Sequence, residues 1–368
     1  MKRLIIIFAA LLAWPAALLA QPTPGDARQA SILLDWIAVA EAEGIAYPAA
    51  DRWALHAISA APGTVGTPDK RLEQAGMILL RAWYGKCCGA GRPSNWHIDN
   101  GWREADMRAG LAEALAQDRL DAFLRTHHPD HPHYRALAHA YQKESDPGRR
   151  QILATNLARW RWMPRSLGER YILVNIAARE LILWDRGQIV DRRRVIVGKR
   201  ATRTPVFSAE VGGVVINPWW EVPVSIAREG IAAMVRRNPA AARARGYVKV
   251  GTRYRQMPGD NNALGRMKLV MPNRFSVYLH DTSNRSLFEQ EERLLSHGCV
   301  RVAGAVEFAE ILLLDDGWAG DSVATIIEAG ATRTVDLSRP FPIYVTYFTM
   351  APDAEGALVE LPDVYGRD

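Results

Sequence analysis

The sequence predicts an α+β fold in which a helical first half is followed by a mostly β second half. Apolar residues recur at helical spacing between about residues 26 and 145, and short strand-like runs replace this pattern after residue 170. A stretch rich in alanine and arginine, residues 225–245, interrupts the β-type runs and predicts a small helical insertion. A chain of 368 residues has room for two ordinary domains.

Residues 1–20 have the layout of a secretory signal peptide. Lys2 and Arg3 give a positive start, the middle of the segment is apolar, and Ala20 is a small residue at the expected cleavage point. An uncleaved N-terminal anchor is the alternative, although Pro15 disfavours one uninterrupted membrane-spanning helix. Because the segment holds two cations and no acid, its removal would lower the formal charge from +6 to +4.

Residues 26–145 are expected to form a helical scaffold domain. Apolar stripes at helical spacing fall within residues 32–40, 72–83 and 111–124. The histidine-rich tract 127–133 contains two prolines, and no matching ligand cluster follows at zinc-site spacing. We therefore expect a helix to begin in this tract, in place of a metal site.

The second half is expected to form a separate domain, residues 171–350, built from short strands. The charged and tryptophan-rich residues 146–170 predict a helix that connects it to the first domain. Within it, residues 225–258 form an insertion that either acts as a lid or only packs on the surface. Residues 351–368 are left as a C-terminal tail.

Charge and cysteine content narrow the class of protein. Arginines are spread singly along the chain and form no basic arm, which argues against a nucleic-acid partner. The three cysteines, Cys87, Cys88 and Cys299, are too few for a disulfide scaffold. A bridge between the adjacent Cys87 and Cys88 would be strained and rare, so no stabilising framework is expected from them. Cys299 then has no obvious partner and is a candidate reactive group.

The surroundings of Cys299 suggest an activated thiol. It precedes an apolar stripe at 302–313 that predicts a helix, and a helix N-terminus favours the thiolate. Gly298 permits an unusual backbone angle beside it. Histidine is the usual base for such a thiol. His297 is too close in sequence to pair well, whereas His280 ends a strand-like run and is either the base or a buried structural histidine.

A spaced motif around this cysteine is informative. His280, followed after sixteen residues by His297 within Ser296-His297-Gly298-Cys299-Val300-Arg301, resembles the signature of the L,D-transpeptidase catalytic domain, the YkuD-type family. The motif is specific because five positions and a gap must agree. Residues 197–199 followed by 204–207 resemble the family's glycine and Thr-Pro segment. Four other segments resemble the larger Gram-negative, YcbB-like branch, which has a helical scaffold domain: 217–223, 262–265, 278–282 and 364–368.

The resemblance implies roles for individual residues. Cys299 would be the nucleophile and His280 the general base, while Ser296, His297 and Gly298 would shape the site. The fold would be the family's mostly β domain, with the insertion as part of its lid.

Four further residues are candidates for substrate binding. Arg301 either holds a substrate carboxylate or is a buried ion-pair partner. Tyr278, Trp219 and Trp220 either line a groove for the peptide or belong to the core, as aromatic residues in strands usually do.

The activity implied is that of a peptidoglycan L,D-transpeptidase without metal or other cofactor. A cysteine thioester forms with a donor stem peptide, and an amine of an acceptor stem resolves it. We expect 3→3 cross-links, with 1→3 links open because the insertion looks short. The alternatives are an L,D-carboxypeptidase, in which water replaces the amine, and a non-catalytic cell-wall-binding protein.

The same resemblance and the leader imply a setting for the protein. We expect a monomer in the periplasm that acts on stem peptides in cell wall biogenesis, alongside other proteins of cell-wall synthesis and cell shape. Carbapenem-type β-lactams are expected to modify Cys299.

Overall fold

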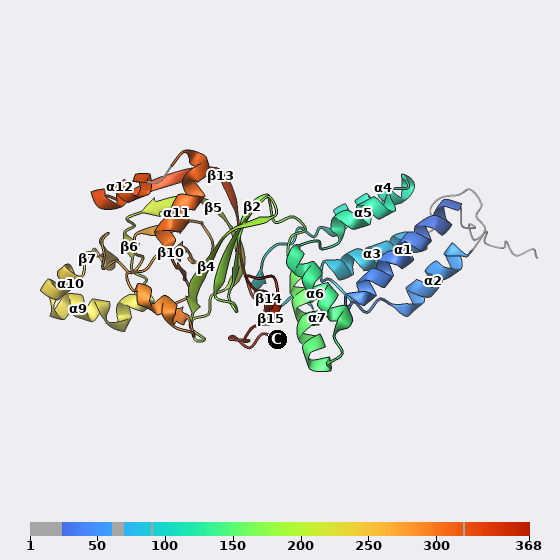
Figure 1. The fold of residues 1–368 in the computed structure, drawn as a ribbon, viewed down its shortest axis with the longest axis horizontal. Coiled ribbons are helices and arrows are strands. Elements are labelled where there is room, and N and C mark those ends of the chain that lie inside the picture. Colours follow the sequence, from blue (N-terminus) through green and yellow to red (C-terminus); the bar gives the residue numbers. More distant parts are fainter. Residues whose placement is uncertain (1–23, 61–69, 90, 319–320) are drawn as a thin grey trace, which may run out of the picture. The chain divides into compact units, whose positions relative to one another are not determined.

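The computed structural model describes residues 24–60, 70–89, 91–318 and 321–368 (Figure 1). The predicted signal peptide, residues 1–20, lies outside these residues. Among the helices that are described, none is both long enough and apolar enough to cross a membrane.

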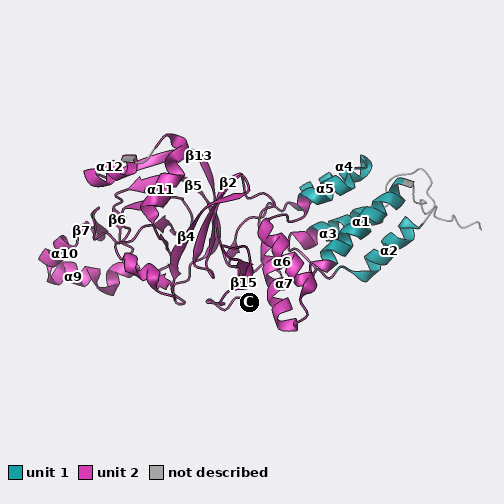
Figure 2. Cartoon of the chain, viewed as in Figure 1, with its two compact units in different colours: residues 1–41, 47–80, 104–126 teal, residues 42–46, 81–103, 127–368 magenta. Residues whose placement is uncertain are grey.

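The described chain divides into two compact units (Figure 2). The first unit comprises residues up to 41 together with 47–80 and 104–126, and the second comprises residues 42–46, 81–103 and 127–368. Helices α6 (Pro132–Lys143) and α7 (Pro147–Arg161) fall within the second unit. The domain boundaries expected near residues 145 and 170 stay predictions.

The first unit is helical, as the apolar stripes predict. Its helices are α1 (Pro24–Ala42), α2 (Ala49–Ser59), α3 (Lys70–Trp83), α4 (Glu104–Ala116) and α5 (Leu120–His127). Leu33, Leu72 and Leu111, one from each stripe, are fully buried. The third stripe breaks at Asp118, whose positive φ of 55° lies between α4 and α5.

The second unit is built on a sheet that closes on itself. In the described chain ten strands form it, in the order β1-β5-β13-β2-β3-β4-β12-β10-β9, with β11 beside β4 and β9 paired back onto β5. Their bounds are β1 (Trp96–His97), β2 (Arg170–Asn175), β3 (Glu180–Asp185), β4 (Gln188–Gly198), β5 (Val206–Ile216), β9 (Met267–Val270), β10 (Leu279–His280), β11 (Leu294–Ser296), β12 (Val300–Val302) and β13 (Arg333–Thr346). The α+β fold class, with helices first and a strand-rich domain after them, is confirmed.

Short helices and a hairpin complete this unit. They are η2 (Arg285–Glu289), α11 (Ala305–Leu313), η3 (Leu314–Asp316) and α12 (Asp321–Ala329), with the hairpin β14 (Met350–Pro352) and β15 (Leu358–Glu360). The helix predicted after Cys299 exists as α11, and Phe308 and Leu312 bury its apolar stripe. The helix start expected in the tract 127–133 is also confirmed. His131 caps α6, because its Nδ1 accepts a hydrogen bond from the His133 amide.

The insertion between β5 and β9 is more than helical. It contains β6 (Trp220–Glu221), α8 (Val224–Ile226), the π-turn η1 (Ala227–Ile231), α9 (Ala232–Arg237), α10 (Pro239–Ala244), β7 (Tyr247–Val250) and β8 (Arg253–Gln256). Strands β6, β8 and β7 form a separate three-stranded sheet, which the expectation of a purely helical insertion lacked. Strand β8 (Arg-Tyr-Arg-Gln) carries little apolar signal, and β7 (Tyr-Val-Lys-Val) is only four residues long.

Candidate active site

The register of two short parallel strands sets the layout of the candidate site. In β10 and β12, Leu279 pairs with Val300 and His280 pairs with Arg301. Leu279 and Val300 are fully buried in the core. Because successive side chains of a strand point to opposite faces, the other face carries Tyr278, His280, Cys299 and Arg301. The fold thus brings the predicted nucleophile and the predicted base onto adjacent strands and the same face.

The helix expected from Val302 begins three residues later than predicted, so Cys299 does not lie at a helix N-terminus. Residues after it form strand β12, and helix α11 starts only at Ala305. The Val300 amide donates to the Tyr278 carbonyl at 3.1 Å, which ties this segment to β10. Two of the three residues of β12 are β-branched valines, which suit a strand. Because a strand and not a helix follows Cys299, the helix dipole of α11 does not explain activation of the thiol.

Ser296 and Gly298 fix the turn that carries the thiol. The buried Ser296 hydroxyl accepts from the Gly298 amide at 3.0 Å and donates to the Cys299 carbonyl. Gly298 has a φ of +118°, a conformation that strongly favours glycine. Both motif residues therefore act on the backbone around Cys299.

A second hydrogen-bonded pair supports the turn from the other side. The buried Thr204 hydroxyl donates to the Gly298 carbonyl at 2.9 Å and accepts from the Gly198 amide at 2.8 Å. The Tyr365 hydroxyl donates to the Gly198 carbonyl at 2.6 Å and accepts from the Thr204 amide at 3.2 Å. The C-terminal segment therefore supports the nucleophile turn through Thr204.

This support has a consequence for the Cys299 amide. In a trans peptide the C=O and the next N–H point in opposite directions, so the bond from Thr204 to the Gly298 carbonyl aims the Cys299 N–H away from Thr204. Within the described residues this N–H has no acceptor, whereas the Gly298 N–H is occupied by Ser296. The Cys299 N–H is therefore free to donate to an oxyanion.

Replacing Thr204 by valine tests the clamp. The change leaves the buried Gly298 carbonyl and Gly198 amide without their partner, and we expect it to lower unfolding free energy by about 1–3 kcal/mol. Thioester formation should slow roughly 10- to 100-fold, because the oxyanion donor loses its fixed orientation. Thr204→Ser keeps the hydroxyl and should stay close to wild type in both chemical denaturation and acylation kinetics. Equal losses in the serine and valine variants would contradict the clamp.

Burial keeps both reacting groups neutral at rest. It raises the pKa of the Cys299 thiol, although a hydrogen bond from Tyr278 and the charge of Arg301 oppose the shift. Burial, assisted by Arg301, lowers the pKa of His280 to about 3. His280 Nδ1 faces the Asp281 carbonyl, an obligate acceptor, so Nδ1 carries the proton and Nε2 is the basic nitrogen.

Arg301 supplies an uncompensated positive charge beside these groups. Its side chain is largely buried, and its Nε has no hydrogen-bond partner. Among the described residues no carboxylate lies within ion-pair distance of it. Arg301 is therefore available to an anionic group of a ligand on the face shared with Cys299.

The three aromatic candidates are placed differently. The Tyr278 side chain hydrogen-bonds to the side chains of both Cys299 and Trp220, and burial raises its pKa. Trp220 is buried in the small core of the insertion, as the core alternative supposed. Trp219 stacks under the Arg255 guanidinium, 4.5 Å from the ring centre. Tyr278 and Trp220 thus connect the insertion to Cys299.

His297 points away from the buried groups. Its side chain is exposed, and its Nε2 lies 3.0 Å from Glu229 Oε2 of η1 in the insertion. The insertion thus contacts the cysteine motif directly.

Comparison with known proteins bears on this site. Residues 169–328 match the family model of the L,D-transpeptidase catalytic domain, YkuD. This region is therefore similar to an L,D-transpeptidase catalytic domain. It contains the Cys299 turn, His280 and the insertion.

A curated relative supports the assignment. The protein named "Putative L,D-transpeptidase" from Haemophilus influenzae is 34% identical over 239 residues, which are 59% of this chain and 48% of the relative. The chain thus spans about half the length of the curated relative.

Solved structures of the family are only distantly similar. The L,D-transpeptidase from Mycobacterium smegmatis is 14% identical, with a TM-score of 0.26 over 48% of this chain and 58% of that one. The Enterococcus faecium L,D-transpeptidase C442S mutant is also 14% identical, with a TM-score of 0.24 over 50% of this chain and 52% of that one.

The second compact unit contains site residues that sequence reasoning missed. Tyr365 and Glu229 were not assigned roles, and Thr204 was noted only as part of a resembling segment. Ser276 was missed as well: its carbonyl lies 4.0 Å from Cys299 Sγ. Thr204 and Tyr365 lie far from Cys299 in sequence, and only the resembling segments that contain them gave any signal.

Two features complete the chemistry around this domain. Cys87 and Cys88 are bonded to each other, so the bond treated as rare does form, but it links neighbours and holds no distant segments together. Cys299 is the free cysteine of the described residues. In that same part of the chain, no group of three or more His, Cys, Asp or Glu side chains is placed to hold a metal ion.

Proposed function

We propose that the protein is a peptidoglycan L,D-transpeptidase that works through a thioester on Cys299. The observation that carries the proposal is the placement of Cys299, with an unoccupied backbone N–H, on the same face as His280 and Arg301. The family match of residues 169–328 supports the reaction class.

The first half-reaction follows from this placement. Cys299 Sγ attacks the carbonyl carbon of a donor stem peptide while its proton passes to Nε2 of His280. The Cys299 N–H stabilises the oxyanion of the tetrahedral intermediate. Collapse of this intermediate breaks the peptide C–N bond, and the leaving amine takes the proton from His280.

The second half-reaction returns the enzyme to its starting form. An acceptor amine attacks the thioester carbon and gives a proton to His280. The C–S bond then breaks and Cys299 recovers its proton. The result is a new amide between two stems.

The charge of Arg301 offers a physical reason why the enzyme would be active only when substrate is bound. Its charge is the largest cause, after burial, of the low pKa of His280. A substrate carboxylate bound to Arg301 would offset that charge and raise the pKa of His280, which makes the imidazole a better base. The proposed donor is a tetrapeptide stem cut after its third residue, which gives 3→3 links.

The proposed location is the periplasm. It rests on the signal-peptide layout of residues 1–20 and on the location of peptidoglycan outside the cytoplasmic membrane.

The product analysis that tests the function uses purified protein with defined disaccharide-tetrapeptides and mass spectrometry of the products. We expect dimers joined through the third residues, with release of the donor's terminal D-residue. Stems that are shortened without dimers would identify an L,D-carboxypeptidase. Dimers from 1→3 attack would correct the donor bond, and no change in the stems would favour a non-catalytic wall-binding protein.

A further inference from the structure

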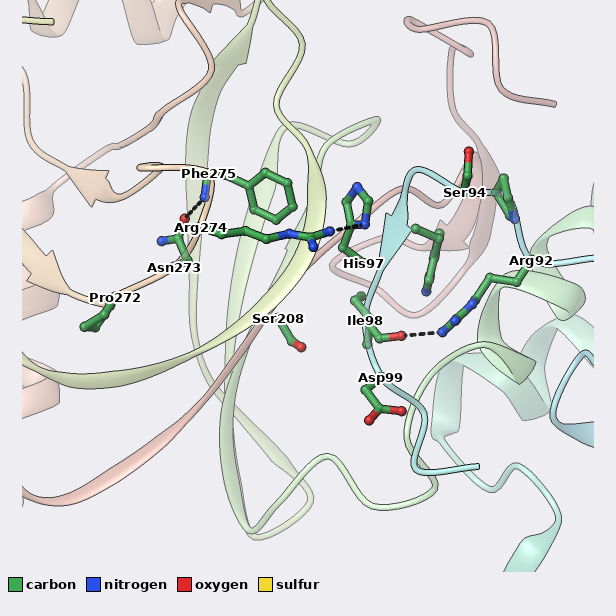
Figure 3. A pocket seen from close by; sticks show the side chains of 12 residues that line it. Arg92, Ser94, His97, Ile98, Asp99, Ser208, Pro272, Asn273, Arg274 and Phe275 are labelled. Carbon is green, nitrogen blue, oxygen red and sulfur yellow. Dashed lines mark hydrogen bonds between the residues drawn. The ribbon is translucent and has the colours of Figure 1, made fainter. Parts of the chain in front are cut away.

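A large open pocket lies outside the catalytic motif and is lined in part by the residues that precede Ser276. It has a volume of about 710 Å³ and lies between segment 92–99, which contains β1, and segment 272–275, which leads to β10 (Figure 3). Ser208 of β5 lies at its base. All of these residues belong to the second compact unit.

Two arginines face this pocket from opposite sides, as Figure 3 shows. Arg274 Nη2 donates to His97 Nδ1 at 2.7 Å, and its guanidinium lies 4.8 Å from the centre of the Phe275 ring. Arg92 Nη1 donates to the Ile98 carbonyl at 2.9 Å. Each guanidinium is thus held in one orientation while most of its N–H groups remain available.

The pocket lining holds two arginines and one acid, Asp99, whose charge interacts with Arg92 as well as with Arg103. Among the described residues, no carboxylate forms an ion pair with Arg92 or Arg274. Asp99, the acid that lines the pocket, is already paired with Arg103 at 2.9 Å. Burial lowers the pKa of His97, and the charges of Arg274 and Arg92 lower it further.

The pocket wall is connected to the nucleophile. Phe275 packs against His97, with ring centres 4.9 Å apart, and against Phe207 at 5.3 Å. The next residue, Ser276, places its carbonyl 4.0 Å from Cys299 Sγ. The pocket wall is therefore joined, along one short segment of chain, to a group that contacts the thiol.

We propose that this pocket binds a carboxylate of a peptide substrate, with Arg274 and Arg92 as its ligands. Guanidinium groups match carboxylates with paired, charge-assisted hydrogen bonds, and peptidoglycan stems carry several carboxylates. The inference rests on the proposed function for the identity of its ligand. It would add a second anion site to the one proposed at Arg301.

The binding test uses the Cys299→Ala protein, so that it does not depend on turnover. Calorimetric titration with a free tetrapeptide stem is compared with the same stem after amidation of its carboxylates. Arg274→Gln and the double variant Arg92→Gln/Arg274→Gln are placed in the same background. Arg186→Gln, at the exposed turn between β3 and β4, is the matched control for charge and residue type.

We expect Arg274→Gln to weaken binding of the free stem by about tenfold, with a larger loss in the double variant. The amidated stem should bind equally weakly to all forms, and Arg186→Gln should behave as the parent protein. Equal affinity of the parent and the double variant for the free stem overturns the proposal, as does an equal loss for the amidated stem.

A second measurement separates this inference from the proposed function. In proteins that retain Cys299, alkylation by neutral iodoacetamide should proceed at the same rate with and without Arg274→Gln, because the thiol is unchanged. The Michaelis constant for the free stem in cross-linking should rise about tenfold in Arg274→Gln. Stem binding that depends on Arg274 in a protein without cross-linking activity would support the pocket and refute the proposed function. An unchanged Michaelis constant in an active enzyme would refute the pocket alone.

Discussion

Replacing Cys299 by alanine is expected to abolish cross-linking, with a loss of roughly 10⁴-fold or more, because the nucleophile has no substitute in the site. The same change should abolish the covalent adduct that we expect a carbapenem-type β-lactam to form. Product analysis measures the first effect, and intact-mass spectrometry the second.

The controls for this variant lie within the chain. Cys299 contributes no disulfide, and its side chain is only half-buried, so the alanine variant should retain the thermal unfolding midpoint of the parent within a few degrees. Cys87 and Cys88 are bonded to each other and should carry no adduct. An adduct that persists in Cys299→Ala, or dimer formation at the parental rate, would remove Cys299 from the mechanism.

Replacing His280 by glutamine should slow thioester formation by about 10²- to 10⁴-fold, since the thiol loses its proton acceptor. Alkylation by iodoacetamide should slow as well, because that reaction also needs the thiolate. The alternative for His280, a buried structural histidine, predicts a loss of stability with an acylation rate that is normal per folded molecule. Denaturation curves measured beside the kinetics separate the two.

The pH profile of acylation provides a sharper test of the same pair. The pKa of His280 is lowered to about 3 and that of Cys299 is raised, so neither group changes protonation in the free enzyme near neutrality. The acylation efficiency kcat/KM should therefore be nearly constant between about pH 5 and pH 8. A fall of about tenfold per unit below about pH 6 would mean that the base titrates near the ordinary value of histidine. The same pH profile measured on His297→Gln shows whether a titration belongs to the exposed His297 or to His280.

Much of the fold could be read from local patterns. The spacing of apolar residues predicted the order of the elements, with helical stripes first and strands after residue 170. This spacing shows which side of an element is buried, and it can be read within a few residues. The helical stripes lie in residues 32–40, 72–83 and 111–124. The strands of the insertion were missed, since each is at most four residues long and pairs only within its own small sheet.

The start of the helix expected after Cys299 was misplaced for a related reason. Val300 and Val302 fit the start of an apolar helical stripe as well as they fit a strand. Pairing with β10 and β4, which lie far away in sequence, decides for the strand. The spacing of apolar residues within one short segment carries no information about such long-range strand pairing.

The sequence by itself predicted the candidate reacting residues of this protein. The spacing of His280 and Cys299 and the glycine at position 298 are local features, and chemistry requires those residue types at those positions. Only the tertiary structure decided how the residues work. The clamp from Tyr365 through Thr204 to Gly298, the free N–H of Cys299 and the two arginines beside Ser276 all depend on contacts between distant segments. Such contacts form when the closed sheet brings these segments together. They therefore depend on the packing of the whole domain and cannot be read from any one stretch of sequence.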